Sequence, residues 1–505
     1  MTHPSKAQVV WFKRDLRVQD HAPLCEAAAA GPVIALFIVE PEWLASADFD
    51  RGHYDFVRQS LMDLDEALRE RGGALLVRRG EAVEVLRGLR EQHPFDDLWS
   101  HEETGNAVTY ARDRRVARWC RDVGVRWHER PNNGVFRRLA SRDGWSARWQ
   151  KRMSRPVLPP PGDLRAPAPS EPPPLADALA LRAPRLQEPQ LGGERQAHET
   201  LQSFLRVRGV NYRQDMSSPL SGWSGCSRMS PYLAWGNLSV RQVHHATLRR
   251  QRWVKAARAS AQEVDPRWAT SLSSFQSRLR WHCHFIQKLE SQPSIEHDNI
   301  HRGYDGLREG EHDEVAFERL KAGQTGFPMV DACVRSLTAT GWLNFRMRAM
   351  LVSFACWDLW LHWRPVALWL APLFLDYEPG IHFSQCQMQA GTAGINTTRV
   401  YSPTKQALDQ DPTGAFIRRW VPELAQLPTP ALAAPWRAAP LELQLAGVGL
   451  DQHYPTPMVD HARAAAEAKR RYFAVKRRAD VREEARRVFE RHGSRRGPPR
   501  SRRRR

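Results

Sequence analysis

The chain has 505 residues and a formal net charge of +19, with 75 lysines and arginines against 56 acidic residues. This length exceeds one ordinary domain, and so large a cationic excess favours a polyanionic partner such as nucleic acid. None of the seven cysteines forms a Cys-x-x-Cys pair, so we expect no structural metal site. No apolar run is long enough for a membrane span and no secretory leader is visible, so we expect a cytoplasmic monomer.

The first 135 residues alternate between short apolar runs and amphipathic segments. The runs typical of buried strands are 8–12, 32–39, 74–78, 97–100 and 125–128. The clearest helix between them spans 54–71, with Phe56, Leu61 and Leu64 on one face. Strands that alternate with helices predict a doubly wound parallel sheet, so residues 1–135 are predicted to form an α/β domain.

The rest of the chain lacks convincing strand pairs. A Pro-rich stretch (VLPPPGDLRAPAPSEPPPL) predicts an interdomain linker over 136–194, either draped over the surface or a flexible tether. Helical periodicity over 195–440 predicts an all-α domain. After Pro457 we expect one long charged helix, docked through Tyr472 and Val481, and then an arginine-rich tail within 441–505. Both DNA contact and a merely solvated end are open for that tail.

Two stretches of the helical region indicate a binding site. In 326–348 (GFPMVDACVRSLTATGWLNFRMR), Pro328 suits a first helical turn, Gly341 breaks the run, and Arg348 follows on a second helix. This polar corner suits a flat aromatic cofactor with an anionic arm. In 225–239 (GCSRMSPYLAWGNLS), small residues, hydroxyls and a cation precede a helix that starts at Pro231. Such a turn suits a pyrophosphate, although an ordinary serine cap explains the pattern too.

These motifs, together with VVWFKRDLRVQDHAPL near the N-terminus and DPTGAFIRRWVPEL at 411–424, resemble the photolyase/cryptochrome family. The resemblance covers Val9 to Leu424. It implies FAD in the helical domain, UV-damaged DNA as the partner, and a second antenna chromophore, a folate or a deazaflavin, near Glu102, Glu103 and Asn106. Surface-loop polarity explains these three residues equally well.

The resemblance also implies which residues hold the flavin. The expected contacts are Tyr212, Cys226, Ser227, Arg228, Met229, Ser230, Arg348, Asp376 and Glu378. We expect an Arg348–Asp376 ion pair beside the ring, because buried charges need a partner. His382 falls at the position that faces the ring, where a histidine can exchange a proton near neutral pH. A satisfied helical histidine is the alternative.

The lesion pocket is implied by the same motifs, with departures. Trp281 matches the tryptophan that stacks on an extruded base. Arg278 stands where repair enzymes have Glu, and Asn344-Phe345 replaces His-Asn. We predict that the DNA-contacting residues are Trp281, His282, Asn344, Phe345, Arg346 and Met388, and that Arg278, Trp281, Trp363 and His382 act in catalysis.

An electron path is a further expectation. Trp363 matches the middle tryptophan of the family relay, whereas Cys386 and Gly310 fall at its two ends. The spacing of Trp357, Trp360 and Trp363 predicts neighbouring rings on one helix and hence an alternative path. Core packing explains the same spacing.

The leading hypothesis is a light-driven lyase that splits UV-induced pyrimidine dimers, most simply of the cyclobutane type. A (6-4) photoproduct lyase would need a proton-transferring histidine, for which His282, His284 and His382 are candidates. A blue-light photoreceptor that signals without repair is the alternative from another class, and a lesion-binding protein without turnover is a third.

Overall fold

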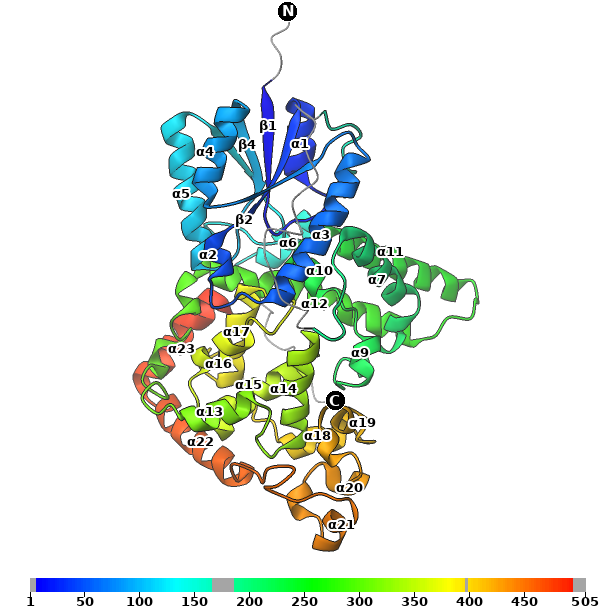
Figure 1. The fold of residues 1–505 in the computed structure, drawn as a ribbon, viewed down its shortest axis with the longest axis vertical. Coiled ribbons are helices and arrows are strands. Elements are labelled where there is room, and N and C mark those ends of the chain that lie inside the picture. Colours follow the sequence, from blue (N-terminus) through cyan, green and yellow to red (C-terminus); the bar gives the residue numbers. More distant parts are fainter. Residues whose placement is uncertain (1–5, 166–185, 396–397, 494–505) are drawn as a thin grey trace, which may run out of the picture.

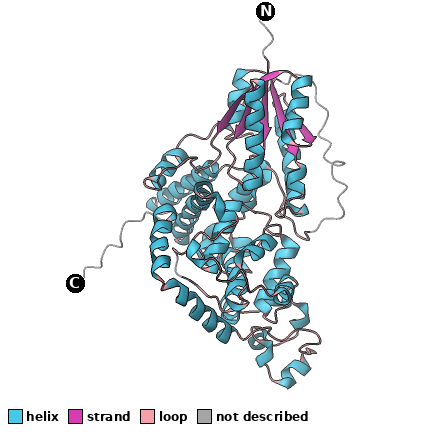
Figure 2. Ribbon diagram, turned by 90° about the vertical axis from the view of Figure 1, so that its left-hand side faces the viewer, coloured by secondary structure: helices cyan, strands magenta, loops and turns pink. Residues whose placement is uncertain are grey.

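The computed structural model describes residues 6–165, 186–395 and 398–493. A sheet with flanking helices occupies one end of the molecule, and helices build the rest of the described chain (Figures 1 and 2). This arrangement confirms the predicted pairing of an α/β domain with an all-α domain. Among the described residues, no helix combines the length and the apolar character needed to cross a bilayer.

The sheet has the strand order β3-β2-β1-β4-β5, and every neighbouring pair is parallel. Its strands are β1 (Ala7–Phe12), β2 (Val33–Val39), β3 (Leu75–Arg79), β4 (Phe95–His101) and β5 (Arg126–Arg130). Each strand overlaps one of the predicted apolar runs. The two strands β1 and β2 are buried along their whole length, as expected for a parallel sheet covered on both faces.

Helices cover both faces of this sheet, which confirms the doubly wound arrangement. They are α1 (Ala22–Ala30), α3 (Arg51–Arg69), α4 (Ala82–Gln92) and α5 (Ala107–Val123). The short helix α2 (Pro41–Leu44) follows β2 and buries none of its residues. Val10 and Phe12 of β1 share one buried cluster with α3, whereas Val9 and Trp11 share another with α4 and α5. Alternate residues of a strand point to opposite faces, so β1 contributes to both cores.

The remaining helices follow a segment that was expected to be only a linker. Within 136–194, α6 (Trp145–Met153) is a correction to that expectation, since it buries Trp145, Trp149 and Met153. Residues 166–185 of the Pro-rich stretch lie outside the described residues. Next come α7 (Glu194–Arg206), α8 (Tyr212–Asp215), α9 (Ser221–Gly225), α10 (Ser230–Ala234), α11 (Val240–Ala259), α12 (Arg267–Ser291) and α13 (Glu314–Lys321).

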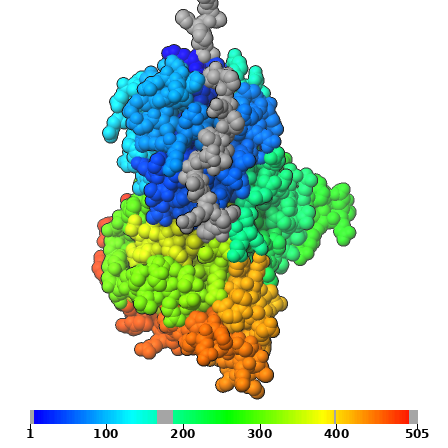
Figure 3. Space-filling view, in the orientation of Figure 1, coloured from blue at the N-terminus to red at the C-terminus, as the bar shows by residue number. Residues whose placement is uncertain are grey.

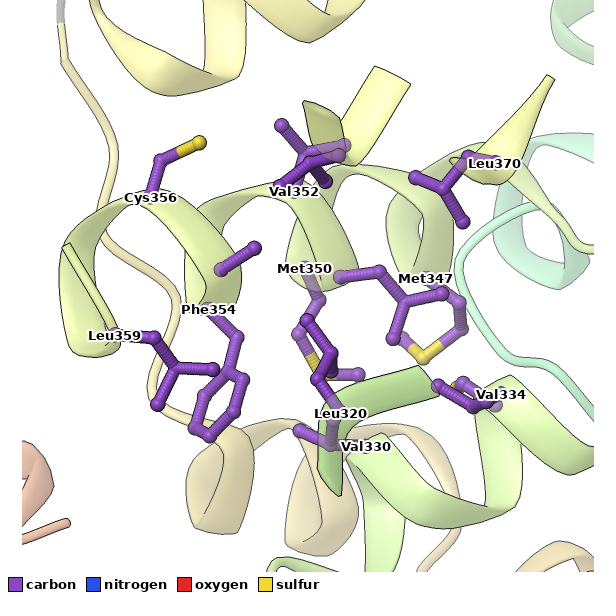
Figure 4. Close-up of a cluster of buried hydrophobic side chains, with 14 of the residues drawn as sticks. Leu320, Val330, Val334, Met347, Met350, Val352, Phe354, Cys356, Leu359 and Leu370 are labelled. Atoms are coloured by element: carbon purple, nitrogen blue, oxygen red, sulfur yellow. The ribbon is translucent and has the colours of Figure 1, made fainter. Parts of the chain in front are cut away.

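The centre of the helical domain is the predicted corner. Pro328 opens α14 (Pro328–Thr340), Gly341 ends it in the left-handed conformation with φ 72°, and α15 (Phe345–Ser353) follows. Figure 4 shows Val330 and Val334 of α14 beside methionines of α15 in the buried cluster between them. This packing fixes the angle between the two helices that carry the corner.

The three tryptophans after α15 do not share one helix, which corrects the prediction. Residues Phe354–Asp358 form a π-helical turn, Trp360 has φ 55°, and α16 (Trp363–Leu370) starts only at Trp363. The Trp360 ring lies between the guanidinium groups of Arg308 and Arg471, at 4.3 and 4.2 Å. Both arginines are distant in sequence, so local spacing does not reveal this break. Helices α17 (Pro379–Ala390), α18 (Pro403–Gln410) and α19 (Ala415–Trp420) follow.

The C-terminal region also differs from the single helix expected. After α20 (Thr429–Leu432) and α21 (Pro440–Leu445), it forms two helices, α22 (His461–Lys476) and α23 (Ala479–His492). Tyr472 and Val481 are buried against the helical domain, as predicted. The arginine-rich tail from residue 494 lies outside the described residues.

Candidate functional site

A cavity of about 300 Å³ opens in the helical domain, with walls from α8, α10, α12, α15 and α17. Most of the predicted site residues line it: Tyr212, Cys226, Ser227, Arg228, Met229, Ser230, Arg278, Trp281, His282, Asn344, Phe345, Arg348, Asp376, Glu378 and His382. Three predicted residues, Arg346, Trp363 and Met388, do not. The structure therefore brings the expected cofactor and lesion residues around one space.

The turn before α10 presents a buried cation. Arg228 has φ 58°, and its guanidinium lies between the rings of Trp223 and Trp342, at 4.2 and 4.1 Å. Its Nε donates to Gln190 at 3.2 Å, and it forms no ion pair with any described carboxylate. Burial lowers the pKa of Arg228 to about 10, so it stays cationic near neutral pH. This arrangement leaves a positive charge available to an anion.

The predicted ion pair at the corner is confirmed. Arg348 donates from Nη1 and Nη2 to the two Asp376 oxygens at 2.9 and 2.8 Å, and its Nε donates to the Leu343 carbonyl. Burial alone would raise the pKa of Asp376, but the Arg348 charge and hydrogen bonds from Arg348 and Ser230 hold it below its ordinary value. Asp376 therefore stays charged, and the two hydrogen bonds fix Arg348 beside the cavity.

Two exposed aromatic rings stand at the cavity mouth. Trp281 on α12 is 43% exposed and Phe345 at the start of α15 is 40% exposed. The Arg278 guanidinium lies over both rings, at 4.6 Å from the first and 5.8 Å from the second. The Arg278 Nε is buried and has no hydrogen-bond partner among the described residues. These groups can stack on and donate to a planar ligand.

The acid–base groups deeper in the wall are mostly neutral. Burial lowers the pKa of His282 to about 4, with Arg14 adding to the effect. Burial raises the pKa of Glu378 to about 7, although Arg14 Nη1 lies 4.0 Å from Glu378 Oε2. The other carboxylate oxygen of Glu378 has no hydrogen-bond partner among the described residues. Glu378 is thus the titratable group of this wall that changes charge near neutral pH.

Of the two roles expected for His382, the structure matches the satisfied helical histidine. Its Nε2 donates to the Ala367 carbonyl at 2.8 Å, and burial lowers its pKa to about 4. The Cys386 sulfur lies 3.8 Å from the same nitrogen, and burial raises the pKa of this thiol well above its ordinary value. His382 is therefore a neutral side chain, held in one tautomer by the backbone, near pH 7.

Two residues that sequence reasoning missed complete the α17 wall. Gln385 and Gln389 line the cavity together with His382 and Cys386. The other three positions follow His382 by three, four and seven residues, so helical spacing from His382 would have found them. The Gln385 and Asn344 side-chain oxygens are buried without a hydrogen-bond partner among the described residues. Each is an acceptor that the protein alone leaves unused.

The three remaining predicted residues, Arg346, Trp363 and Met388, lie outside the cavity lining. Met388 packs against the hydrophobic core instead of the cavity, and Arg346 lies on α15 beside the lining residues but not among them. Trp363 is fully buried and donates its indole N–H to Asn299 at 2.7 Å. Trp357, in contrast, donates to the backbone carbonyl of Gln389 and so lies directly behind the cavity wall.

A second cavity, of about 90 Å³, lies between the sheet and the helical domain. Trp43, Trp235 and Tyr377 line it, together with the predicted antenna residues Glu103 and Asn106. Glu103 already accepts hydrogen bonds from backbone amides and from Arg112, and Asn106 caps α5. Glu102 instead lines a smaller polar cavity. Glu103 and Asn106 therefore stabilise the loop before α5, and the aromatic rings form the apolar lining of the cavity.

Comparison with known proteins places this geometry in context. A family model described as the FAD binding domain of DNA photolyase matches residues 275–474, and one described as DNA photolyase matches residues 8–144. The chain is 31% identical to a cryptochrome DASH of Gloeobacter violaceus, over 99% of each chain. It is 30% identical to a deoxyribodipyrimidine photo-lyase of Streptomyces griseus, over 92% of this chain and 98% of the relative. A bacterial class III photolyase from Agrobacterium tumefaciens superposes with a TM-score of 0.83 at 26% identity, and the match covers 95% of this chain and 99% of that one.

Proposed function

Because the chain belongs to the photolyase/cryptochrome family, we propose that it is a light-driven lyase that splits cyclobutane pyrimidine dimers in UV-damaged DNA. The observation that carries the proposal is the single cavity whose walls hold the flavin-type contacts and whose mouth holds two exposed aromatic rings. A cofactor site and a base-stacking site therefore share one space.

The residues present fit FAD. Arg228 offers a desolvated cation to a pyrophosphate, and the Arg348–Asp376 pair supplies fixed charges beside a flat ring. The unused acceptors on Asn344, Gln385 and Glu378 match the N–H and O–H donors that a flavin carries. When bound and reduced, FAD supplies the light-driven electron that opens the dimer.

The chain's own part is to bind, orient and shield the lesion. Trp281 and Phe345 stack on the extruded bases, since base–aromatic stacking contributes ~1–3 kcal/mol per base. Arg278, which donates but does not accept, holds a pyrimidine carbonyl at the mouth. Extrusion costs a few kcal/mol, least for a poorly paired lesion, so these contacts favour the damaged site.

The histidines argue against the (6-4) photoproduct as substrate. Burial lowers the pKa values of His282 and His382 to about 4 and that of His284 to about 2. Each is therefore neutral near pH 7 and is a poor proton donor there. The cyclobutane dimer needs no such donor, so it remains the proposed lesion.

A blue-light photoreceptor without repair is the second candidate. One observation favours it: Phe345 presents no polar atom to a lesion, and Arg278 presents only donors. A pocket of this kind holds a flavin without holding a dimer as repair enzymes do. The large positive net charge favours repair, because DNA binding depends on phosphate neutralisation.

The second cavity is the proposed antenna site. Its aromatic lining of Trp43, Trp235 and Tyr377 suits a planar chromophore such as a folate or a deazaflavin. Reconstitution with each chromophore, followed by absorbance after gel filtration, tests this assignment. Retention of neither chromophore would contradict it.

The decisive experiment illuminates the flavin-loaded protein with a dimer-containing oligonucleotide and measures restored thymines. Restoration under blue light and none in the dark is the expected result. Its absence with reduced FAD bound would exclude the lyase and leave the photoreceptor.

A matched pair of variants tests the mouth. Trp281→Ala should reduce the ratio of damaged to undamaged DNA affinity by roughly tenfold, whereas Trp253→Ala, another exposed tryptophan beside an arginine, should leave that ratio unchanged. An unchanged ratio in folded Trp281→Ala protein would refute the stacking assignment.

A further inference from the structure

Helix α11 has a charge pattern unlike that of the other long surface helices. It carries Arg241, Arg249, Arg250, Arg252, Lys255 and Arg258, and no aspartate or glutamate along its whole length. Helix α23, by comparison, carries acidic residues that pair with its arginines, as Arg487 does with Glu483. A solvated helix is normally stabilised by such pairs. Because α11 has no acidic residues, a negatively charged partner would have to balance its cations.

The outer half of α11 gathers this charge on its exposed side. Arg249, Arg252, Lys255 and Arg258 are exposed, follow one another at three-residue intervals, and form no ion pair with any described residue. Like charges at this spacing repel each other on a helix. Arg206, at the end of α7, adds a further cation close to Arg250. A polyanion would relieve this repulsion along the whole row.

An exposed indole lies within the same row. Trp253 is 48% exposed, and the Arg250 guanidinium lies 4.1 Å from its ring and 4.9 Å from that of the buried Trp268. The stack fixes Arg250 and Trp253 against α12. The cationic surface is therefore held by packing and does not depend on flexible side chains alone.

The row also has a fixed position relative to the cavity mouth. Helix α11 and the first turns of α12 form the projection on the right of Figures 1 and 3, and Val254 of α11 shares a buried cluster with Trp268 of α12. Helix α12 then runs without a break to Trp281 at the mouth. From Trp268 to Trp281 it rises roughly 20 Å, which is about six base pairs of duplex.

We propose that the exposed row Arg249, Arg252, Lys255 and Arg258 on α11 binds the phosphate backbone of duplex DNA about half a helical turn from the base held at the cavity mouth. This inference rests on the proposed function for the position of the lesion. The contact itself is sequence-independent and needs neither light nor a lesion. It neutralises the one row of the helix that the protein leaves uncompensated.

The test measures DNA binding in the dark, by fluorescence anisotropy over a range of salt concentrations. The ligand is an undamaged duplex of two helical turns, and the variant is R249Q/R252Q/K255Q/R258Q. Its control, R463Q/K469Q/R477Q/R482Q, removes the same number of exposed, unpaired charges from α22, α23 and the turn between them. Each lost phosphate contact should lower the slope of log K against log salt concentration by about 0.9.

The expected result is a smaller slope for the α11 variant and a wild-type slope for the control. A dimer-containing duplex of only half a turn should show no difference between the two variants, because it cannot reach α11. An unchanged slope for the α11 variant, or an equal loss in both variants, would overturn the proposal. So would loss of binding to phosphatidylserine vesicles with DNA binding intact, which would identify a membrane surface as the partner.

The two proposals fail separately. If the α11 variant has a smaller salt slope but the wild-type protein restores no thymines, this inference holds and the repair function is wrong. If the wild-type protein restores thymines but the α11 variant has a wild-type salt slope, the repair function holds and this inference is wrong.

Discussion

Two cations beside the main cavity differ in what neutralises them. Arg348 is paired with Asp376 through two hydrogen bonds, whereas Arg228 has two indole rings for neighbours and no described carboxylate within ion-pair distance. The first pair is complete within the protein and serves as a rigid wall. The second cation is desolvated and unpaired, which makes it the stronger attractor for an anionic group.

Removing one partner of the complete pair should be costly. Asp376→Asn leaves the Arg348 charge beside the cavity without its counter-charge, and we expect a loss of about 3 kcal/mol in the free energy of unfolding. Urea unfolding of the flavin-free protein measures it, and flavin absorbance should fall in parallel. Asp480→Asn, in the exposed pair with Arg478, is the control and should change neither. Equal stability of Asp376→Asn and wild type would show that the pair is dispensable.

Glu378 predicts a pH dependence of stability with a definite sign. Burial raises its pKa from 4.5 to about 7, so the folded state favours the neutral carboxyl. The stabilising contribution of Glu378 is therefore fully present below its unfolded-state pKa of 4.5 and is lost as the pH rises through its folded-state pKa of about 7. Glu378→Gln is neutral at every pH, so its melting temperature should exceed that of wild type at pH 8 and equal it at pH 4. A difference independent of pH would contradict the burial argument.

At the residue scale, the sequence predicted correctly which side chains line the cavity where a motif determined both the helix and the face of that helix. Lining positions on α15 are Phe345, Arg348, Ala349 and Val352, which share one face at helical spacing. Arg346 is one position from Phe345, hence about 100° around the helix, and so it misses the cavity. Met388 misses it on α17 for the same reason, next to Gln389. Adjacency in a motif was a poorer guide than periodicity.

Close contact between α12 and α17 determines the shape of the cavity, since α12 supplies Trp281 and α17 supplies His382. At the crossing, a Cβ on Gly380 would lie 2.6 Å from the Ile286 Cα atom, a backbone atom that cannot turn aside. Gly380 is therefore needed for the approach of the two helices. A larger residue would separate the mouth from the deep wall.

Gly380→Ala should consequently destabilise the protein by about 1–3 kcal/mol and reduce flavin binding. Gly88→Ala is the matched control, because nothing lies within 4 Å of a Cβ at that position in α4. It should stabilise the protein by about 0.5–1 kcal/mol. Chemical denaturation of both variants measures the two effects, and a destabilised Gly88→Ala with an unaffected Gly380→Ala would reverse the interpretation.

Helices and strands could be predicted where local sequence patterns determine them. The positions at which helices are interrupted or end could not. All five strands and the α14–α15 corner follow from apolar runs, Pro328 and Gly341. At the break, Trp360 contacts Arg308 and Arg471, which are distant in sequence, and the end of α22 at Lys476 has neither Gly nor Pro beside it. Such boundaries are set by tertiary contacts, which spacing along one helix does not contain.

On the scale of the whole molecule, the sheet domain and the helical domain meet through buried polar contacts. Asp20, after β1, accepts hydrogen bonds from Nε and Nη2 of Arg241 and one from the Ser239 hydroxyl at the start of α11. Arg17 donates to the Gly236 carbonyl. The loops after β1 and before α11 therefore join the two halves, and the cationic projection is anchored at the same point.

Asp20→Asn tests whether this joint couples the halves. Asp20 has φ 56°, a conformation that Asn also adopts, so the change removes charge without straining the backbone. Burial alone would raise the pKa of Asp20, but hydrogen bonds from Arg241 and the charge of Arg17 hold it below its ordinary value. The contribution of Asp20 to the free energy of unfolding is therefore present near neutral pH and is lost as the pH falls through that lowered pKa.

For this variant we expect a loss of about 3 kcal/mol at pH 7 and, in scanning calorimetry, one transition at a lower temperature, because a buried hydrophobic cluster still spans the two domains. The two proteins should converge in acid, where the wild-type carboxyl is also neutral. A single transition at the wild-type temperature would mean that apolar contacts alone join the domains. The α11 row would then lack the polar anchor that fixes its distance from the cavity mouth.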